Sequence, residues 1–349
     1  MIKTIKELKL AIDEKMKECN AVVIVPHIGT DCDALASSLA VALIAKKYGR
    51  DFVIVMDDEK VESVVSSIMA ELPPEIKFVN SKLLEEYLKD KKALYIVVDT
   101  NKRELIPIKD IDARDNVIVI DHHDVGESSI LTEDKFISLG VSSASEIMFK
   151  LLEDMRIKYD SNLQGTELNF NIANYLLAGI FLDTSKFEKN TFSGTMKVVG
   201  NLMVKGADLT YVNNLFMEDF ESDQLVLNLV RNPYVKLFNI AIALNTEDPK
   251  FIYDKEALAK AADFLNKYKS IDAAFAIGLI DKNTTYVSGR SKGDVNIGEI
   301  MSQLGGGGNA SSGAAKIEEC EDVYQIKLKL DDVIRPGYKF HDMESKKIN

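Results

Sequence analysis

Short apolar runs of strand-like composition recur through the first part of the chain, and helix-like patterns separate them. The runs are Ala21 to Pro26, Ala93 to Val98 and Asn116 to Ile120. The helix-like patterns cover residues 33–48, 61–71 and 81–91. Strands that alternate with helices favour a parallel sheet covered by helices. We therefore expect an α/β fold built on a parallel sheet.

A polar patch follows each apolar run, and together these patches contain three of the chain's four histidines. A further patch ends the helix-like run from Asn174 to Leu182. The patches contain histidines and aspartates, residue types that commonly bind metals and are here called metal-type residues. In chain order they are His27, Asp31 and Asp33, then Asp99, then Asp121, His122 and His123, then Asp183. Ligands of open parallel sheets gather beyond the carboxyl ends of the strands. The sequence thus predicts that these side chains meet at one edge of the sheet.

A set of carboxylates and imidazoles without clustered thiolates suits Mn²⁺ or a similar divalent ion better than structural zinc. The six candidate ligands are His27, Asp31, Asp33, Asp99, His122 and Asp183. If Asp99 and Asp183 bridge, the set suffices for two ions roughly 3.5–4 Å apart, a pair that can activate water and clamp a phosphoryl oxygen. An Asp after a strand often only caps the next helix, an alternative that stays open for Asp99 or Asp183 taken alone. The four patches together predict a two-metal phosphoester hydrolase.

A run of four glycines, Gly305 to Gly308, precedes Asn309 late in the chain. Glycines let a backbone approach a ligand closely, and we expect a helix to follow whose amino end favours anions. Apolar, alternating segments on both sides, including Tyr324 to Leu330, argue against a flexible linker. Arg290 is the candidate phosphate contact, because a guanidinium fork matches phosphate oxygens. A solvated arginine at a strand end is the alternative.

The chain has 349 residues and a formal net charge of −12. This charge argues against a long nucleic acid as partner, since such binding normally needs a basic surface. No run of apolar residues is long enough to span a membrane, and the amino end is charged and helix-like rather than a signal peptide. We expect a cytoplasmic protein with a small-molecule substrate.

The ordered motifs resemble those of the DHH–DHHA1 phosphoesterases. They are HxxxDxDA from His27, VVDT ending at Thr100, DHH at Asp121 to His123, GIxxDT from Gly179 and the late glycine run. The strings VVDTNK, SSASE (Ser142 to Glu146) and GRSKGDVNIGEIMSQLGGGGN (Gly289 to Asn309) look most like the catalytic portion of the GdpP-type cyclic-di-AMP phosphodiesterases. The family usually has a histidine after the glycines, where this chain has Asn309.

The resemblance implies two domains, with metals on a larger parallel-sheet domain and substrate contacts on a smaller α/β domain. We expect a metal-binding catalytic domain at residues 1–205, a helical connector at 206–232 and a substrate-binding domain at 233–349, with the active site between the two lobes. The resemblance further implies that His27 and Asp31 hold one ion and that Asp33 and His122 hold the other. Asp99 and Asp183 would lie near both. His123 and Asp99 would be the catalytic residues. The substrate contacts would be Arg290, Gly306, Gly307, Gly308 and Asn309.

The implied reaction is hydrolysis of cyclic-di-AMP to pApA, with further cleavage to AMP, by a homodimer that uses two Mn²⁺ ions, with Mg²⁺ or Co²⁺ as alternatives. A nano-RNase or pAp phosphatase acting on short linear substrates is a second hypothesis, which Asn309 disfavours. A non-catalytic nucleotide-binding module is a third. The complete set of metal-type residues argues against that last alternative.

Overall fold

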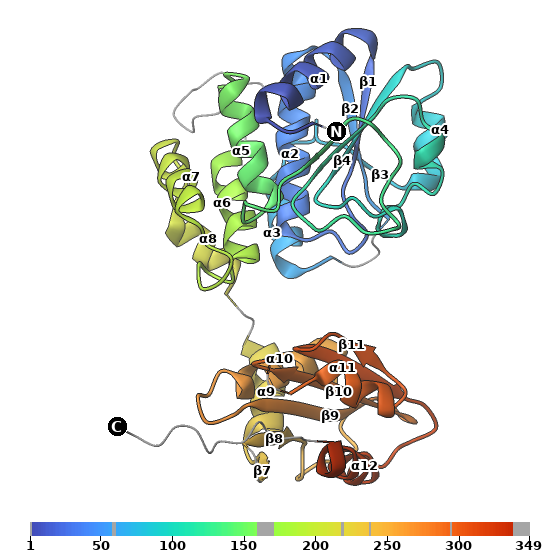
Figure 1. Cartoon of the computed structure of the whole chain (residues 1–349), viewed down its shortest axis with the longest axis vertical. Coiled ribbons are helices and arrows are strands. Elements are labelled where there is room, and N and C mark those ends of the chain that lie inside the picture. Colours follow the sequence, from blue (N-terminus) through green and yellow to red (C-terminus); the bar gives the residue numbers. More distant parts are fainter. Residues whose placement is uncertain are drawn as a thin grey trace. The chain divides into compact units, whose positions relative to one another are not determined.

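The computed structural model describes residues 2–57, 61–158, 171–217, 220–236, 239–293 and 295–337. The chain divides into two compact units, Met1–Met217 and Glu218–Asn349 (Figure 1). Each unit contains its own six-stranded sheet. The α/β fold with two units that was predicted from the sequence is confirmed.

The sheet of the first unit is entirely parallel. Its strands lie in the order β3-β2-β1-β4-β5-β6. They are β1 (Ala21–Val25), β2 (Asp51–Val55), β3 (Phe78–Val79), β4 (Ala93–Val98), β5 (Val117–Asp121) and β6 (Lys135–Ile137). The three apolar runs of the sequence form β1, β4 and β5, which lie side by side in the interior of the sheet.

Helices cover one face of this sheet, because alternate strand residues such as Val22 and Ile24 pack into one core with α1, α2, α3, α5 and α6. The opposite residues, such as Val23, pack with α4 and with the loops after β4. The helices are α1 (Ile5–Glu18), α2 (Cys32–Lys47), α3 (Ser63–Glu71), α4 (Leu84–Tyr87), α5 (Ala144–Asp154), α6 (Ile172–Asp183), α7 (Ser193–Val204) and α8 (Leu209–Leu215). Single turns of 3-10 helix lie at Ser81–Leu83, Arg103–Leu105 and Ile111–Ala113.

The strand order creates a crevice at one place. From β1 the chain moves outward to β2 and β3, then returns to β4 on the other side of β1. Connections therefore leave β1 and β4 in opposite directions, and ligands of doubly wound sheets bind beyond the carboxyl ends of such a strand pair. The patches that begin at His27 and Asp99 follow these two strands, so the topology brings them to this point.

The second unit has a mixed sheet in the order β11-β12-β10-β9-β8-β7, in which only β8 and β9 are parallel among the pairs of the described residues. Its strands are β7 (Tyr234–Lys236), β8 (Ile240–Ala243), β9 (Ala273–Asp281), β10 (Thr284–Ser291), β11 (Gly307–Gly308) and β12 (Ser312–Ile317). One face packs against α11 (Ile297–Gln303) and α12 (Val323–Gly337). The other face packs against α9 (Phe220–Val230) and α10 (Lys255–Asn266).

The prediction of an alternating segment from Tyr324 to Leu330 was wrong, since these residues lie in α12. Ile326 and Leu330 are buried together with Val323 and Ile334, and this spacing is that of one helix face. Leu328, which a strand would place on the same side as Ile326, is 60% exposed.

The expectation that a helix follows the glycine run was also wrong, because β12 follows it and α11 precedes it. Nor is the amino end of α11 open to an anion. The N–H groups of Ile297 and Gly298 donate to the carbonyls of Ala310 and Asn309. The loop after the glycines therefore occupies the groups that an anion would need.

The longest helix in the described ranges, α2, has 16 residues, whereas a bilayer span needs about 20 apolar residues. None of the helices described is long and apolar enough to cross a membrane.

Candidate metal centre

The turn from β1 into α2 holds Asp31 in two roles at once. Its Oδ1 accepts hydrogen bonds from the backbone N–H groups of Asp33 and Ala34, so Asp31 is the N-cap of α2. Its Oδ2 points to the other side and lies 3.6 Å from Nε2 of His27. Capping and metal-type chemistry are thus not alternatives at this position, because each uses a different oxygen.

Asp33 lies in the first turn of α2 and is fully buried. Its two oxygens accept hydrogen bonds from the backbone N–H groups of Ala144, at 2.7 Å, and Ser145, at 2.8 Å. These are the first residues of α5, so the carboxylate lies at the positive end of that helix. Its Oδ2 also lies 3.9 Å from Nε2 of His122. The helix end therefore fixes the orientation of Asp33 before any ion binds.

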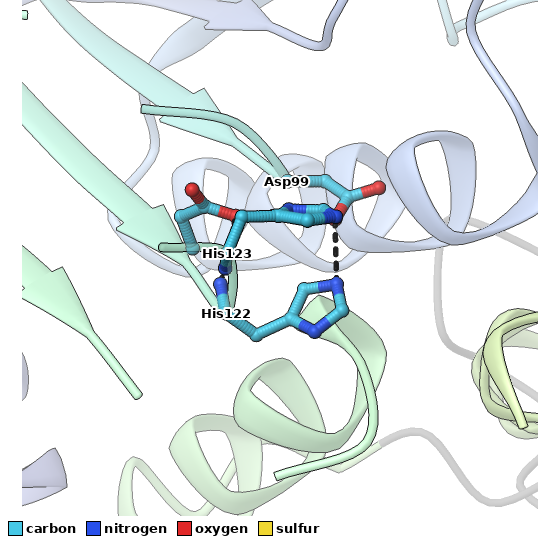
Figure 2. A group of neighbouring side chains, drawn as sticks. Asp99, His122 and His123 are labelled. Carbon is cyan, nitrogen blue, oxygen red and sulfur yellow. Dashed lines mark hydrogen bonds and ion pairs between the residues drawn. The ribbon is translucent and has the colours of Figure 1, made fainter. Parts of the chain in front are cut away.

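Asp99 lies at the centre of the cluster and is 3% exposed. Its Oδ2 is 3.5 Å from Nε2 of His27, and its Oδ1 is 3.2 Å from Nε2 of His122. Figure 2 shows its carboxylate beside the rings of His122 and His123. The backbone of Asp99 has a φ of 61°, a left-handed conformation that is uncommon outside glycine and that concentrates at functional sites.

Asp183 is the last residue of α6, and its Oδ2 lies 3.1 Å from Nε2 of His122. The approach of α6 to α2 and α5 depends on Gly179. A Cβ at that position would lie 2.6 Å from Oδ1 of Asp33. The glycine one turn before Asp183 thus allows the two carboxylates to share one site.

His123 is positioned by a buried carboxylate. Its Nδ1 lies 2.8 Å from Oδ1 of Asp121, and Oδ2 of Asp121 accepts from Nδ2 of Asn101 at 2.6 Å. Asp121 and Asn101 are fully buried, whereas the side chain of His123 is 54% exposed. An imidazole whose Nδ1–H is held by a carboxylate presents Nε2 to the surroundings. His123 therefore faces outward from the cluster with a fixed ring.

The electrostatics of the cluster reflect crowded carboxylates. Burial and the charges of Asp99 and Asp183 raise the pKa of Asp33 well above its usual value. Burial alone would lower the pKa of His27, but Asp31 and Asp99 raise it to about 11. Burial would likewise lower the pKa of His122, yet Asp183 and Asp99 raise it to about 11. Without a metal, the histidines carry protons that offset the negative charge of the carboxylates.

These residues fit divalent metal ions. The possible ligand atoms of the described residues fall into three groups that share Asp99. Two of them contain the predicted ligands, His27, Asp31 and Asp99 in one and Asp33, Asp99, His122 and Asp183 in the other, and the third consists of Asp99, Asp121, His122 and His123. Oδ1 of Asp99 and Nε2 of His122 are buried, yet neither makes a hydrogen bond of good geometry within the described residues. They lie 3.2 Å from each other, and buried polar atoms that have close contacts but no well-aligned hydrogen bond are costly. A divalent cation would supply both atoms with a partner and neutralise the carboxylates.

The structure brings together all six of the predicted metal ligands, and His123 lies beside them. A cavity of about 400 Å³ opens next to the cluster. Its lining includes His122, His123, Val141, Asp183, Asn190 and Phe192. This volume is within the range of small-molecule sites, roughly 300–1,000 Å³.

The predicted substrate contacts lie in the second unit and fall in two places. Asn309 borders a shallow hollow of about 480 Å³ beside α11. Its side-chain oxygen accepts hydrogen bonds from the backbone N–H groups of Ser311 and Ser312. A Cβ at Gly298 would lie 2.7 Å from the carbonyl of Gly308, so part of the glycine run packs against α11.

Arg290 lies on the other side of that sheet. A Cβ on the preceding residue, Gly289, would meet Met301 of α11, so the alternating strand turns Arg290 toward α10. There its Nε donates to Oδ1 of Asp263 at 3.0 Å. The glycine run, which includes the edge strand β11, packs against α11, whereas the side chain of Arg290 contacts α10 on the opposite face of the same sheet.

Sequence reasoning missed three residues of this site. Asn101 holds Asp121, Gly179 makes room for Asp33, and Phe192 lines the cavity. Asn101 and Gly179 lie within the strings VVDTNK and GIxxDT, so the motifs contained the signal. Phe192 belongs to no sequence motif, and its position in the cavity lining depends on the conformation of the turn after α6.

Comparison with known proteins agrees with the fold and the cluster. Residues 21–180 match the DHH family, N-terminal domain, and residues 237–335 match the DHHA1 domain. The chain is 30% identical over 338 residues to the cyclic-di-AMP phosphodiesterase GdpP of Bacillus subtilis, a match that covers 94% of this chain and 50% of that protein. It is 30% identical over 318 residues to the cyclic-di-AMP phosphodiesterase PdeA of Listeria monocytogenes, covering 88% and 46%.

A solved structure, that of an exopolyphosphatase-related protein from Bacteroides fragilis, has a TM-score of 0.73 at 18% identity and covers 94% of this chain and 95% of its own. At that identity the similarity concerns the fold alone. The chain spans about half the length of the curated relatives named above. The two domain matches, together with the acidic cluster, identify the chain as a member of the DHH–DHHA1 family, whose metal-type residues fit a metal-dependent hydrolase.

Proposed function

We propose that this chain is a metal-dependent phosphodiesterase that hydrolyses cyclic-di-AMP to linear pApA, with further cleavage to AMP as a second step. The observation that carries the proposal is that two of the ligand groups, which share Asp99, contain all six predicted ligands at the ends of β1, β4, β5 and α6. The two relatives named as cyclic-di-AMP phosphodiesterases support the choice of substrate.

The proposed cofactor is a pair of Mn²⁺ ions, with Mg²⁺ or Co²⁺ as alternatives, because the donors are carboxylates and imidazoles. His27 and Asp31 would hold one ion, Asp33 and His122 the other, and Asp99 and Asp183 would contact both. Bound there, the ions would act as Lewis acids on a phosphoryl group and lower the pKa of water. Asp33 and Asp31 contribute a preset geometry, because backbone N–H groups already hold oxygens of both carboxylates.

His123 is the proposed proton donor to the departing oxygen. Its ring faces outward beside the cluster, and Asp121 fixes the Nδ1 side. The hydrogen bond to Asp121 is the main cause that raises the pKa of His123, so the ring holds a proton more readily at neutral pH. A positioned acid of this kind contributes roughly 10²–10⁴-fold to a rate.

We propose for the domains the roles that the sequence predicts. Residues 1–205 would carry the metals, 206–232 would connect, and 233–349 would bind substrate through Gly306 to Asn309 and Arg290. The boundary of the two compact units, after Met217, falls inside the proposed connector. A phosphate at Arg290 would have to compete with Asp263. A homodimer stays a prediction from the resemblance, and a cytoplasmic location stays a prediction from the sequence.

The test is hydrolysis of cyclic-di-AMP, cyclic-di-GMP, linear pApA and pAp in parallel, with Mn²⁺ and with EDTA, resolved by chromatography. The proposal expects cleavage of cyclic-di-AMP to pApA that stops on addition of EDTA. Cleavage of the linear substrates alone would transfer the chain to the nano-RNase and pAp phosphatase group. Absence of any cleavage with Mn²⁺, Mg²⁺ and Co²⁺ would favour a binding module.

A further inference from the structure

The cavity beside the metal cluster is lined by residues of two kinds. His122 and Asp183 are among the polar ones, and Leu139, Val141 and Phe192 are the apolar ones, here called the apolar wall. Phe192 is 45% exposed. An aromatic ring at the edge of a polar cavity offers a flat apolar contact a short way from charged groups. Such a combination suits a ligand that is itself part aromatic and part anionic.

A buried glutamate holds both ends of the apolar wall. Glu146 is 1% exposed, and its Oε2 accepts hydrogen bonds from the backbone N–H and the hydroxyl of Ser142. The same oxygen accepts from the hydroxyl of Thr195 at 2.8 Å. Ser142 directly follows Val141, and the hydroxyl of Thr195 accepts from the backbone N–H of Phe192. One carboxylate thus ties the segment that bears Val141 to the segment that bears Phe192.

The turn after α6 is unusual and leads directly to Phe192. Ser185, Lys186 and Phe187 are consecutive non-glycine residues with φ values of 48°, 63° and 69°, and Asn190 has a φ of 46°. Left-handed residues in succession are strained and persist where the surrounding structure holds them. Here the ring of Phe187 packs edge-on against Phe181 of α6, with centroids 5.4 Å apart. The turn places Asn190 and Phe192 in the cavity lining.

We propose that this apolar wall is the subsite for one nucleobase of the substrate, which stacks on the ring of Phe192 while its phosphodiester lies at the metal cluster. The proposal rests on the proposed function, in which the substrate is a nucleotide. Stacking on an aromatic ring accepts any base, because every base has a π face. The amide of Asn190, which can donate and accept, stands in the same lining to contact a base edge.

The test compares Phe192→Ala with Met196→Ala. Met196 lies one turn further along α7, is 50% exposed and is absent from the cavity lining. Loss of stacking on one base should raise the KM for pApA by about 5- to 150-fold in Phe192→Ala. Met196→Ala should leave KM unchanged. An abasic dinucleotide, which keeps the phosphodiester, should have the same KM with both variants and the wild type.

A second variant allows binding to be measured without turnover. The chain contains no tryptophan, so Phe192→Trp introduces a single tryptophan at the subsite, which can be excited at wavelengths where the tyrosines do not absorb. AMP, which carries a base but no phosphodiester, should quench its emission, and inorganic phosphate should not. Equal quenching by both, or none, overturns the subsite. An unchanged KM for pApA in Phe192→Ala also overturns it while the proposed hydrolase stands. Quenching by AMP without cleavage of any dinucleotide supports the subsite and rejects the hydrolase.

Discussion

Gly179 of α6 lies against Asp33 of α2 so closely that a Cβ on Gly179 would be 2.6 Å from Oδ1 of Asp33. Gly179→Ala should therefore displace Asp33 or push α6 away, and overpacking of this kind costs about 1–3 kcal/mol. We expect a lower free energy of unfolding in urea and a strong loss of Mn²⁺-dependent hydrolysis, because Asp33 and Asp183 would separate.

Gly200→Ala is the matched control. Gly200 lies inside α7, where a Cβ meets nothing within 4 Å. Alanine is favoured over glycine inside a helix by roughly 0.5–1 kcal/mol, so this variant should be slightly more stable and fully active. If Gly179→Ala behaved like Gly200→Ala in both assays, the close approach of α6 to Asp33 would be irrelevant to the site.

Asp99→Asn should separate activity from folding. The change keeps the size of the side chain but removes a charge that raises the pKa of Asp33. The metal-free variant should stay folded, because lower repulsion among the carboxylates offsets part of the loss of the contacts of Asp99 with His27 and His122. Its turnover should drop by several orders of magnitude, since every ligand group includes Asp99. Thermal melts by circular dichroism and hydrolysis assays decide this, and turnover near the wild-type value would refute the shared ligand.

Metal binding should release protons. In the metal-free protein, contacts with carboxylates raise the pKa values of His27 and His122 to about 11, so both rings are protonated at neutral pH. A metal must displace these protons. The apparent affinity for Mn²⁺ should therefore increase as the pH rises from about 6 to about 8. Calorimetric titrations in two buffers of different ionisation enthalpy measure the protons released, and identical heats in both buffers would contradict the prediction.

The same raised pKa values also determine how the stability of the metal-free protein changes with pH. A histidine whose pKa is higher in the folded than in the unfolded state stabilises the fold fully below the unfolded value, about 6.5. That contribution is lost as the pH rises toward about 11, the value of the folded protein. Added Mn²⁺ should counter this loss.

Asn309 should act on the loop through its side-chain oxygen. This atom accepts from the backbone N–H groups of Ser311 and Ser312, each at 2.9 Å. Asn309→Ala should lower the free energy of unfolding of the chain by about 0.5–1.5 kcal/mol per hydrogen bond lost. Asn309→Asp keeps the accepting oxygen and should be close to the wild type. Equal destabilisation by the two changes in urea titrations would mean that the oxygen does not shape the loop.

Much of the first unit was predictable because its signals are local. The buried strands β1, β4 and β5 are continuous apolar runs, as strands covered on both faces must be. The order of these strands in the sheet could not be predicted from local sequence. The polar patches that follow them nevertheless indicated that their ends lie at one edge of the sheet. The string from Ser142 to Glu146, noted for its resemblance, begins a helix in the structure, where Ser143 caps α5.

The remaining features depend on contacts that sequence patterns do not encode. The alternation from Tyr324 to Leu330 resembles a strand, but burial of Ile326 and Leu330 against the second sheet selects a helix. The close approach of Gly179 to Asp33 joins residues far apart in the chain. The packing of Gly308 against Gly298 of α11 was not indicated by the glycine run itself, whose contact with a ligand stays a prediction.

The central claim is that the cluster around Asp99 holds two ions. The most direct measurement is equilibrium dialysis of the wild-type chain and Asp99→Ala against Mn²⁺, followed by determination of metal and protein content. The account predicts two ions per wild-type chain and loss of both high-affinity sites in Asp99→Ala. A single ion in the wild type, or two in the variant, would contradict it.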